Sequence, residues 1–144
     1  MEIRRMRTGD VPQIAELEKV CFGDPWSEHS IASELTNPLS CWLVAEEDGK
    51  VAGYVGSQTV LDGADMMNIA VAPQYRRRGI AEQLVEKLAA GVKEKGAVCL
   101  MLEVRASNAP AICLYEKMQF KQVGRRPNYY RNPKEDALIM RKEW

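Results

Sequence analysis

The chain has 144 residues, of which 46% are apolar, and its 20 Lys and Arg residues balance 20 Asp and Glu residues. This length and apolar content predict a single domain over residues 1–144 with a core of its own. Zero formal net charge excludes the overall positive field of a dedicated nucleic-acid-binding protein.

The N-terminal region predicts a strand and two short helices. Residues 2–7 alternate weakly as a strand. Thr8-Gly9-Asp10 supplies a turn and an N-cap for a helix that runs to about Val20. Ser27 is placed to cap a second helix, which ends at Asn37-Pro38.

Three strands follow these helices. They are expected over residues 41–46, 51–60 and 64–72. Asp48-Gly49 joins the first two as a hairpin, because this pair tolerates the positive φ angles of such a turn. Pro73 ends the third strand.

The C-terminal half alternates helices with strands. From Gly79 to about Lys95, apolar residues recur every four positions, which predicts one amphipathic helix. Residues 98–104 are apolar on both faces except for Glu103, as in a strand buried inside a sheet. The remaining elements are a helix over 109–118 capped by Asn108, and strands over 120–123 and 137–140 around a loop of residues 124–135. The order β-αα-βββ-α-β-α-ββ predicts an α/β fold, a mixed central sheet flanked by helices on both faces.

Residues 73–84, PQYRRRGIAEQL, set three arginines and a glycine against the start of the long helix. Unpaired N–H groups and the positive end of a helix favour an anion there, and the arginines can donate to phosphate oxygens. A solvated basic turn is the alternative, because short motifs match by chance. A nucleic-acid patch would need more basic charge around it than this chain has.

The same stretch carries a family resemblance. Arg76-x-x-Gly79-x-Ala81 resembles the R/Q-x-x-G-x-G/A motif of the GCN5-related N-acetyltransferase (GNAT) superfamily, in which backbone amides of this loop hold the pyrophosphate of coenzyme A. MNIAVAP resembles the splayed cofactor strand of that family. EVRASNAPAICLYEKMQF is very similar to the signature of its bacterial ribosomal-protein-alanine N-acetyltransferase (RimI-type) group, as are CFGDPWS and RRPNYY.

The resemblance spans about the whole chain, and it implies a GNAT fold with acetyl-CoA as co-substrate and no metal. The cofactor-binding residues that it implies are Ile69, Ala70, Val71, Arg76, Arg77, Arg78, Gly79, Ile80, Ala81, Glu82 and Asn108. Residues 69–71 would act through backbone groups, because a splayed or bulged strand leaves N–H groups unpaired. Asn108 would reach the pantetheine arm, although it is also a plain N-cap.

Acetyl transfer from a thioester requires a neutral amine, a polarised carbonyl and a proton for the thiolate. Glu103 ends an apolar strand, where partial burial favours its use as a base, directly or through water; an ion pair with Arg105 is the alternative. The resemblance implies that Glu103 is the general base and Tyr115 the general acid. Without the resemblance, a core aromatic residue is the alternative for Tyr115, and it is the commoner role of a tyrosine in a helix. Gln119 stands where the family usually has Gly, so the connection that follows this helix is expected to shift slightly.

The resemblance also implies a peptide acceptor that enters between two loops, Pro25-Trp26-Ser27 and Asn128-Tyr129-Tyr130. Its contacts would be Pro25, Trp26, Tyr129 and Tyr130. The implied reaction is direct acetylation, in a ternary complex, of the N-terminal amine of a protein, and in the RimI type that amine is the N-terminal alanine of a ribosomal small-subunit protein. A small-amine acetyltransferase acting on a polyamine or antibiotic, and a non-enzymatic RNA- or ribosome-binding module, remain alternatives.

The cellular setting follows from what the sequence lacks. Cys21, Cys41, Cys99 and Cys113 lie far apart in apolar surroundings without a CxxC pair, which favours buried thiols in a reducing compartment over disulfides or zinc ligands. No apolar run reaches the length of a signal peptide core or a membrane span. We expect a cytoplasmic protein with no membrane partner and no direct nucleic-acid partner.

Overall fold

The secondary structure follows the predicted order, in a computed structural model that describes residues 1–144. The strands are β1 (Glu2–Arg5), β2 (Ser40–Glu47), β3 (Lys50–Val60), β4 (Gly63–Val71), β5 (Cys99–Arg105), β6 (Lys121–Tyr130) and β7 (Glu135–Glu143). The helices are α1 (Val11–Cys21), α2 (Glu28–Ser33), α3 (Ile80–Glu94) and α4 (Ala109–Lys117), and short 3-10 turns cover Thr8–Asp10 and Pro73–Tyr75.

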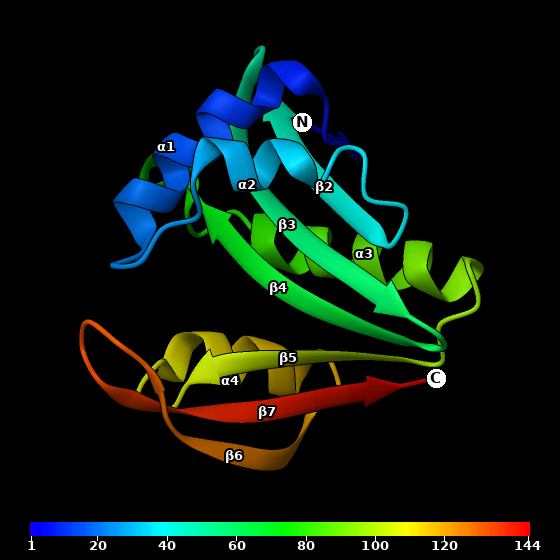
Figure 1. Ribbon diagram of the computed structural model, residues 1–144, viewed down its shortest axis with the longest axis vertical. Helices are drawn as coiled ribbons and strands as arrows, with labels where there is room; N and C mark the ends of the chain where they lie inside the picture. Colours follow the sequence, from blue (N-terminus) through cyan, green and yellow to red (C-terminus); the bar gives the residue numbers. More distant parts are fainter.

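All seven strands form one mixed sheet in the order β1-β2-β3-β4-β5-β7-β6, in which only the β4–β5 pair is parallel. Helices α1 and α2 cover one face of the sheet, and α3 and α4 cover the other (Figure 1). The predicted α/β architecture is therefore confirmed.

Each face of the sheet has its own core. The apolar stripe of α3 is buried as its period predicts, and it packs with β5 and α4 in the larger core. The smaller core joins α1 and α2 to β2 and β3, around Ile14, Ile31, Trp42 and Tyr54. Val20, in the last turn of α1, is 63% exposed, whereas the charged residue Glu18 is buried.

Strands β4 and β5 pair over only four residues each, Gly63–Met66 with Cys99–Leu102. Beyond these residues the two strands diverge toward the edge of the molecule where the β6–β7 turn lies (Figure 1). A parallel pair that opens in this way leaves backbone groups on its inner edges without ladder partners. The opening is the feature that positions the candidate site.

A β-bulge in β4 accompanies the opening. Gly56 pairs with Asn68 but Ser57 pairs with Met66, so Met67 is an extra residue in β4. Because side chains alternate along a strand, one extra residue reverses the faces that later residues take. Ala64 and Met66 accordingly lie in the core with α3, whereas Ala70 and Ala72 lie in the core with α1.

The C-terminal hairpin differs most from the sequence prediction. Residues 124–130, expected in a loop, extend β6 to Tyr130, and only residues 131–134 form the turn. Gly124, Pro127 and Asn128 are poor strand residues, but β6 is an edge strand, where Pro is tolerated, and its pairing with β7 is irregular between Arg126 and Tyr130.

Three smaller details of the structure differ from the sequence predictions. Asp10 precedes α1 without capping it, because its carboxylate accepts from Arg4 at 2.8 and 2.9 Å and from the Arg7 amide at 2.7 Å. Cys41 and Cys99 are buried, but Cys113 is exposed on α4. Gln119 takes the left-handed conformation itself, with φ of 76°, so the connection keeps the form that a glycine would give it.

None of the helices has both the length and the apolar character needed to span a membrane.

Candidate active site

The loop before α3 forms a cradle of backbone amides. Arg77 and Gly79 have positive φ angles of 65° and 73°, and the first helical hydrogen bond runs from the Gln83 amide to the Gly79 carbonyl. The amides of Ile80, Ala81 and Glu82 therefore have no acceptor within the helix. They face an anion-binding position at the positive end of a helix dipole.

A cavity of about 210 Å³ lies at this cradle. It brings together seven of the predicted cofactor residues with two that the sequence did not indicate, Tyr75 and Leu114; the seven are Val71, Arg76, Arg77, Gly79, Ile80, Ala81 and Glu82. A Cβ atom built on Gly79 would meet nothing within 4 Å, so the space beside that residue is open. The arrangement fits a pyrophosphate held mainly by main-chain N–H groups.

Two of the three arginine side chains have partners within the protein. The Nε of Arg76 donates to the Val71 carbonyl at 3.2 Å. Arg78 lies outside the cavity lining, pairs with Glu47 at 3.2 Å and stacks over Tyr75 at 5.3 Å. The Arg78 side chain is therefore directed to the β2–β3 hairpin.

The second half of β4 offers amides to the opening. The Ala72 amide donates to the Ala52 carbonyl on β3. Since hydrogen-bonding direction alternates along an antiparallel strand, Ala70 also faces β3, whereas Ile69 and Val71 direct their backbone groups toward β5. The contact of Arg76 with the Val71 carbonyl agrees with this direction. Two amides thus point into the opening, where a carbonyl could accept from them.

Asn108 serves as the N-cap of α4, as its Oδ1 accepts from the Ala111 amide at 3.3 Å. The Nδ2 group has no protein partner and can still donate to a ligand. The capping and ligand-binding interpretations of Asn108 are therefore compatible.

Glu103 lies on β5, beyond the last residue paired with β4. Its neighbours Leu102 and Val104 face the α3 core, so Glu103 faces the side that carries α1 and α2. Its carboxylate is 3.5 Å from Nε of Arg126, and its side chain is 30% exposed. The ion pair with Arg105 considered from the sequence is not formed; Arg105 instead binds the carbonyls of Arg131 and Pro133 at 2.9 and 2.8 Å.

Tyr115 is 5% exposed, with its ring packed edge-on against Phe120 at 5.7 Å. Burial, with a smaller contribution from Tyr130, raises the pKa of its hydroxyl well above the usual value. The side chain is thus a core aromatic whose hydroxyl remains protonated at neutral pH.

The chain segments that carry the two predicted acceptor loops are in contact. Gly23, beside the Pro25-Trp26-Ser27 loop, lies so close to Asn132 that a Cβ atom on Gly23 would be 2.9 Å from the Asn132 carbonyl oxygen. Trp26 packs on Trp42 at 5.5 Å, whereas Pro25 is exposed. The segments that carry these loops therefore touch, and we call the two loops together the acceptor wall.

Tyr129 and Tyr130 form the other part of that wall, with perpendicular rings 5.0 Å apart. Tyr130 stacks under Arg105 at 4.4 Å, and burial is the main cause that raises its pKa to about 12. Tyr129 is half-exposed, and its hydrogen-bonding interaction with Glu103, followed by burial, raises its pKa. Both tyrosines lie in β6 rather than in a loop, next to the proposed base.

Several residues of the site were not predicted. Tyr75 and Leu114 line the cavity, Arg126 lies beside Glu103, and Glu18 accepts from the Trp26 amide and from Asn68. The sequence held one signal for Glu18, which lies four residues after the buried Ile14 and therefore on the inner face of α1. The others depend on contacts between distant segments.

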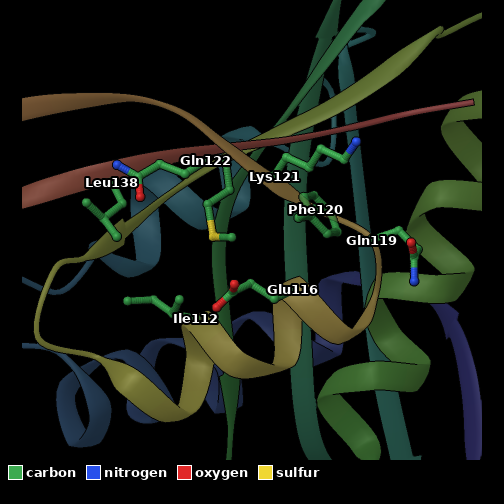
Figure 2. A pocket seen from close by; sticks show the side chains of 8 residues that line it. Ile112, Glu116, Gln119, Phe120, Lys121, Gln122 and Leu138 are labelled. Carbon is green, nitrogen blue, oxygen red and sulfur yellow. The ribbon is translucent and has the colours of Figure 1, made fainter.

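A larger cavity of about 350 Å³ lies elsewhere, between α4 and the β6–β7 hairpin. Figure 2 shows Ile112 and Glu116 of α4 on one side of it, and Gln122 and Leu138 on the other. It contains none of the predicted site residues and no helix N-terminus. Its size alone does not make it a cofactor site. No cluster of three or more His, Cys, Asp or Glu side chains in the structure is arranged to hold a metal ion.

Comparison with known proteins gives a consistent result. The model of the acetyltransferase (GNAT) family matches residues 11–120. A Bacillus subtilis (strain 168) protein is 44% identical over 139 residues, which cover 96% of this chain and 92% of that protein. The ribosomal protein bS18-alanine N-acetyltransferase of Escherichia coli (strain K12) is 39% identical over 140 residues, or 96% of this chain and 94% of the relative.

Comparison with solved structures leads to the same kind of protein. The crystal structure of the ribosomal-protein-S18-alanine N-acetyltransferase from Escherichia coli has a TM-score of 0.90 and 38% identity, and the match covers 99% of this chain and 92% of that one. Arabidopsis thaliana NAA60 in complex with acetyl-CoA shares the fold, with a TM-score of 0.87 at 18% identity over 99% of this chain and 97% of that one.

Proposed function

The chain belongs to the GNAT acetyltransferase family, and we propose that it transfers the acetyl group of acetyl-CoA to the N-terminal amine of a protein. The acceptor that we propose is the N-terminal alanine of the ribosomal small-subunit protein on which its relatives are named to act. The co-substrate supplies an activated thioester carbonyl, and the residues of this chain supply binding, orientation and proton transfer.

The opening between β4 and β5 is the observation that carries this proposal. The amide cradle of α3 lies at its mouth, the amides of Ile69 and Val71 point into it, and Glu103 lies on its other edge. Phosphate-binding groups, carbonyl-binding groups and a carboxylate thus follow one path across the sheet. This is the order of groups along acetyl-CoA, from its pyrophosphate to its reactive end.

Binding would begin at the α3 cradle. Main-chain N–H groups of residues 80–82 hold the pyrophosphate, and Asn108 Nδ2 donates to the pantetheine arm. Further along, the amides of Ile69 and Val71 donate to a pantetheine amide and to the thioester oxygen. Fixed donors at that oxygen stabilise the negative charge that develops when the amine attacks.

Glu103 would remove the proton from the acceptor amine, directly or through a water molecule. An N-terminal amine has a pKa of about 7.7 to 8.0, against about 10.4 for lysine, so it needs little help to become neutral near pH 7. Arg126 and Tyr129 hold the carboxylate in place. The lower pKa of the N-terminal amine favours it as the acceptor over a lysine side chain.

Tyr115 would donate to the departing sulfur. A thiol has a pKa of about 8.5, below that of this buried phenol, so a full proton transfer from Tyr115 to the thiolate is uphill. The contribution expected of Tyr115 is therefore a hydrogen bond that stabilises the developing thiolate, followed by protonation from solvent.

Mass spectrometry of a peptide panel tests the proposal. The protein and acetyl-CoA are incubated with an alanine-initiated peptide that contains a lysine, with the same peptide blocked at its N-terminus, and with spermidine and an aminoglycoside. We expect one acetyl group on the first peptide only, located at its α-amine. Acetylation of a small amine while every peptide stays unmodified would contradict the proposed acceptor.

A further inference from the structure

A carboxylate that the proposed mechanism does not use lies beneath the acceptor loop. Glu18 of α1 is 1% exposed, and no Lys or Arg side chain pairs with it. Both oxygens accept from Nδ2 of Asn68, at 3.0 and 2.9 Å, and the Trp26 amide donates to Oε1 at 2.9 Å. The Tyr54 hydroxyl also donates to Oε2. Every partner of this carboxylate is a hydrogen-bond donor.

Such a group is costly as a core filler. Removing a charge from water costs several kcal/mol unless hydrogen bonds compensate it, and apolar residues of the same size often stabilise a core better. Glu18 is also unsuited to act as a base, because its oxygens are buried and already bound. The structural role of Glu18 is therefore to connect the segments that it binds.

Those segments are the two sides of the proposed reaction. Trp26 belongs to the acceptor loop, and Asn68 is the first residue after the extra residue Met67 of β4. The bulge turns the Asn68 side chain to the α1 face and directs the Ile69 and Val71 amides into the opening. If β4 slipped by one residue, those amides would face β3 instead. The bond from Asn68 to Glu18 opposes that slip.

We propose that Glu18 is a positioning residue that couples the acceptor loop to the bulge of β4. It fixes the amides that bind the acetyl carbonyl relative to the wall that holds the incoming amine. This inference rests on the acetyl transfer proposed above.

The main variant is Glu18→Gln, which keeps the shape but places an NH2 group against donors. We expect kcat for the peptide to fall about tenfold or more and its KM to rise. Coenzyme A affinity, measured by calorimetry, should fall by no more than about threefold, because the pyrophosphate contacts of the α3 cradle lie outside this network and only the pantetheine contact of the amides in β4 lies inside it. Glu16→Gln is the matched control, on the same helix but with a side chain that is 72% exposed, and it should behave as the unaltered protein does.

Exchanging the hydrogen-bond donor of Asn68 with the acceptor of Glu18 distinguishes a positioning role from a general loss of stability. Asn68→Asp alone sets two carboxylates against each other and should also lose activity. In the double variant Glu18→Gln with Asn68→Asp, the Gln amide can donate to Asp while its oxygen still accepts from Trp26. With all proteins assayed well below their unfolding temperatures, the double variant should recover kcat to within about threefold of the original.

Amide hydrogen exchange tests the coupling without any catalysis. In Glu18→Gln, the Trp26 amide and the amides of Ala70 and Ala72, which face β3, should lose protection together; if Glu18→Gln does not fold, Asn68→Ala provides the same comparison. A folded Glu18→Gln with unchanged kcat and KM, a double variant without recovery, or faster exchange at Trp26 alone would overturn the proposal. Failure of the unaltered protein to acetylate any peptide would instead count against the proposed function.

Discussion

The cofactor cradle and the acceptor wall are built in opposite ways. The cradle comes from one continuous stretch, residues 71–82, and acts through backbone conformation, with positive φ at Arg77 and Gly79. The acceptor wall is assembled from α1, β5, β6 and two loops, by side-chain contacts such as those of Arg105 with residues 130–133. A local motif thus suits the part that binds an invariant ligand, and long-range contacts form the part that selects an acceptor.

The largest effect on the acceptor side is expected from Glu103→Gln. Loss of the base should lower kcat by about 100-fold or more, in the range usual for general base catalysis. Coenzyme A affinity should change by less than about twofold, because the cradle does not involve this side chain. Steady-state kinetics and calorimetry measure the two quantities. Unchanged kcat across pH 6 to 9 would remove Glu103 from the mechanism.

On the cofactor side, Gly79→Val should weaken coenzyme A binding by about 100-fold. A β-branched residue at φ of 73° is strained, and its side chain would fill the open space beside the amides. Arg78→Ala should weaken binding by less than about threefold, because Arg78 pairs with Glu47 at the surface. Calorimetry that found the reverse order would refute a cradle made of backbone.

Gly23→Ala tests the contact between the two acceptor loops. The added Cβ atom would be 2.9 Å from a backbone oxygen of Asn132, so the loops must separate. We expect the KM for the peptide to rise about three- to tenfold with kcat little changed. Gly9→Ala is the control, because a Cβ atom there meets nothing within 4 Å. Equal KM values for the two variants would mean that the loop junction does not shape the groove.

Gln119→Gly should give the smallest change, and a favourable one. Gln119 follows α4 in the left-handed conformation, and the Phe120 amide bonds back to the Tyr115 carbonyl at 2.9 Å, as in a Schellman motif. Relief of this strain should raise the free energy of unfolding by about 0.5 to 1 kcal/mol, measured by urea denaturation. Gln119→Ala should give no gain. Activity should not change.

The cradle could be predicted from the sequence because it is formed by residues that are neighbours in the chain. A strand stop at Pro73, a glycine at position 79 and a helical period from Ile80 suffice to predict unpaired amides at that point. The same pattern could not predict where Arg78 points, because its partner Glu47 lies 31 residues away. Contacts between side chains so far apart in the sequence depend on the register of the sheet, and the turn residues do not determine that register.

The acceptor side was predicted in outline only. Ser27 and Asn108 cap their helices as expected, because capping involves a few neighbouring residues. The extent of β6 was wrong, since local propensity argues against a strand through Pro127 and pairing with β7 overrides it. The hydrogen bond between Glu18 and Asn68 could not be predicted from the sequence. The two residues are 50 positions apart, and they meet only because the bulge turns Asn68 toward α1.

The extra residue in β4 also determines where this protein can change its length. The hairpin at Asp48 and Gly49 can gain or lose residues at the surface. Deletion of Met67, in contrast, would exchange the environments of every residue from 68 to 72, forcing Ile69 and Val71 into the space that Ala70 and Ala72 occupy beneath α1. An insertion or deletion in this strand should therefore be tolerated far less well than a substitution. Another residue can replace Met67, but Met67 cannot be deleted and no second residue can be added beside it.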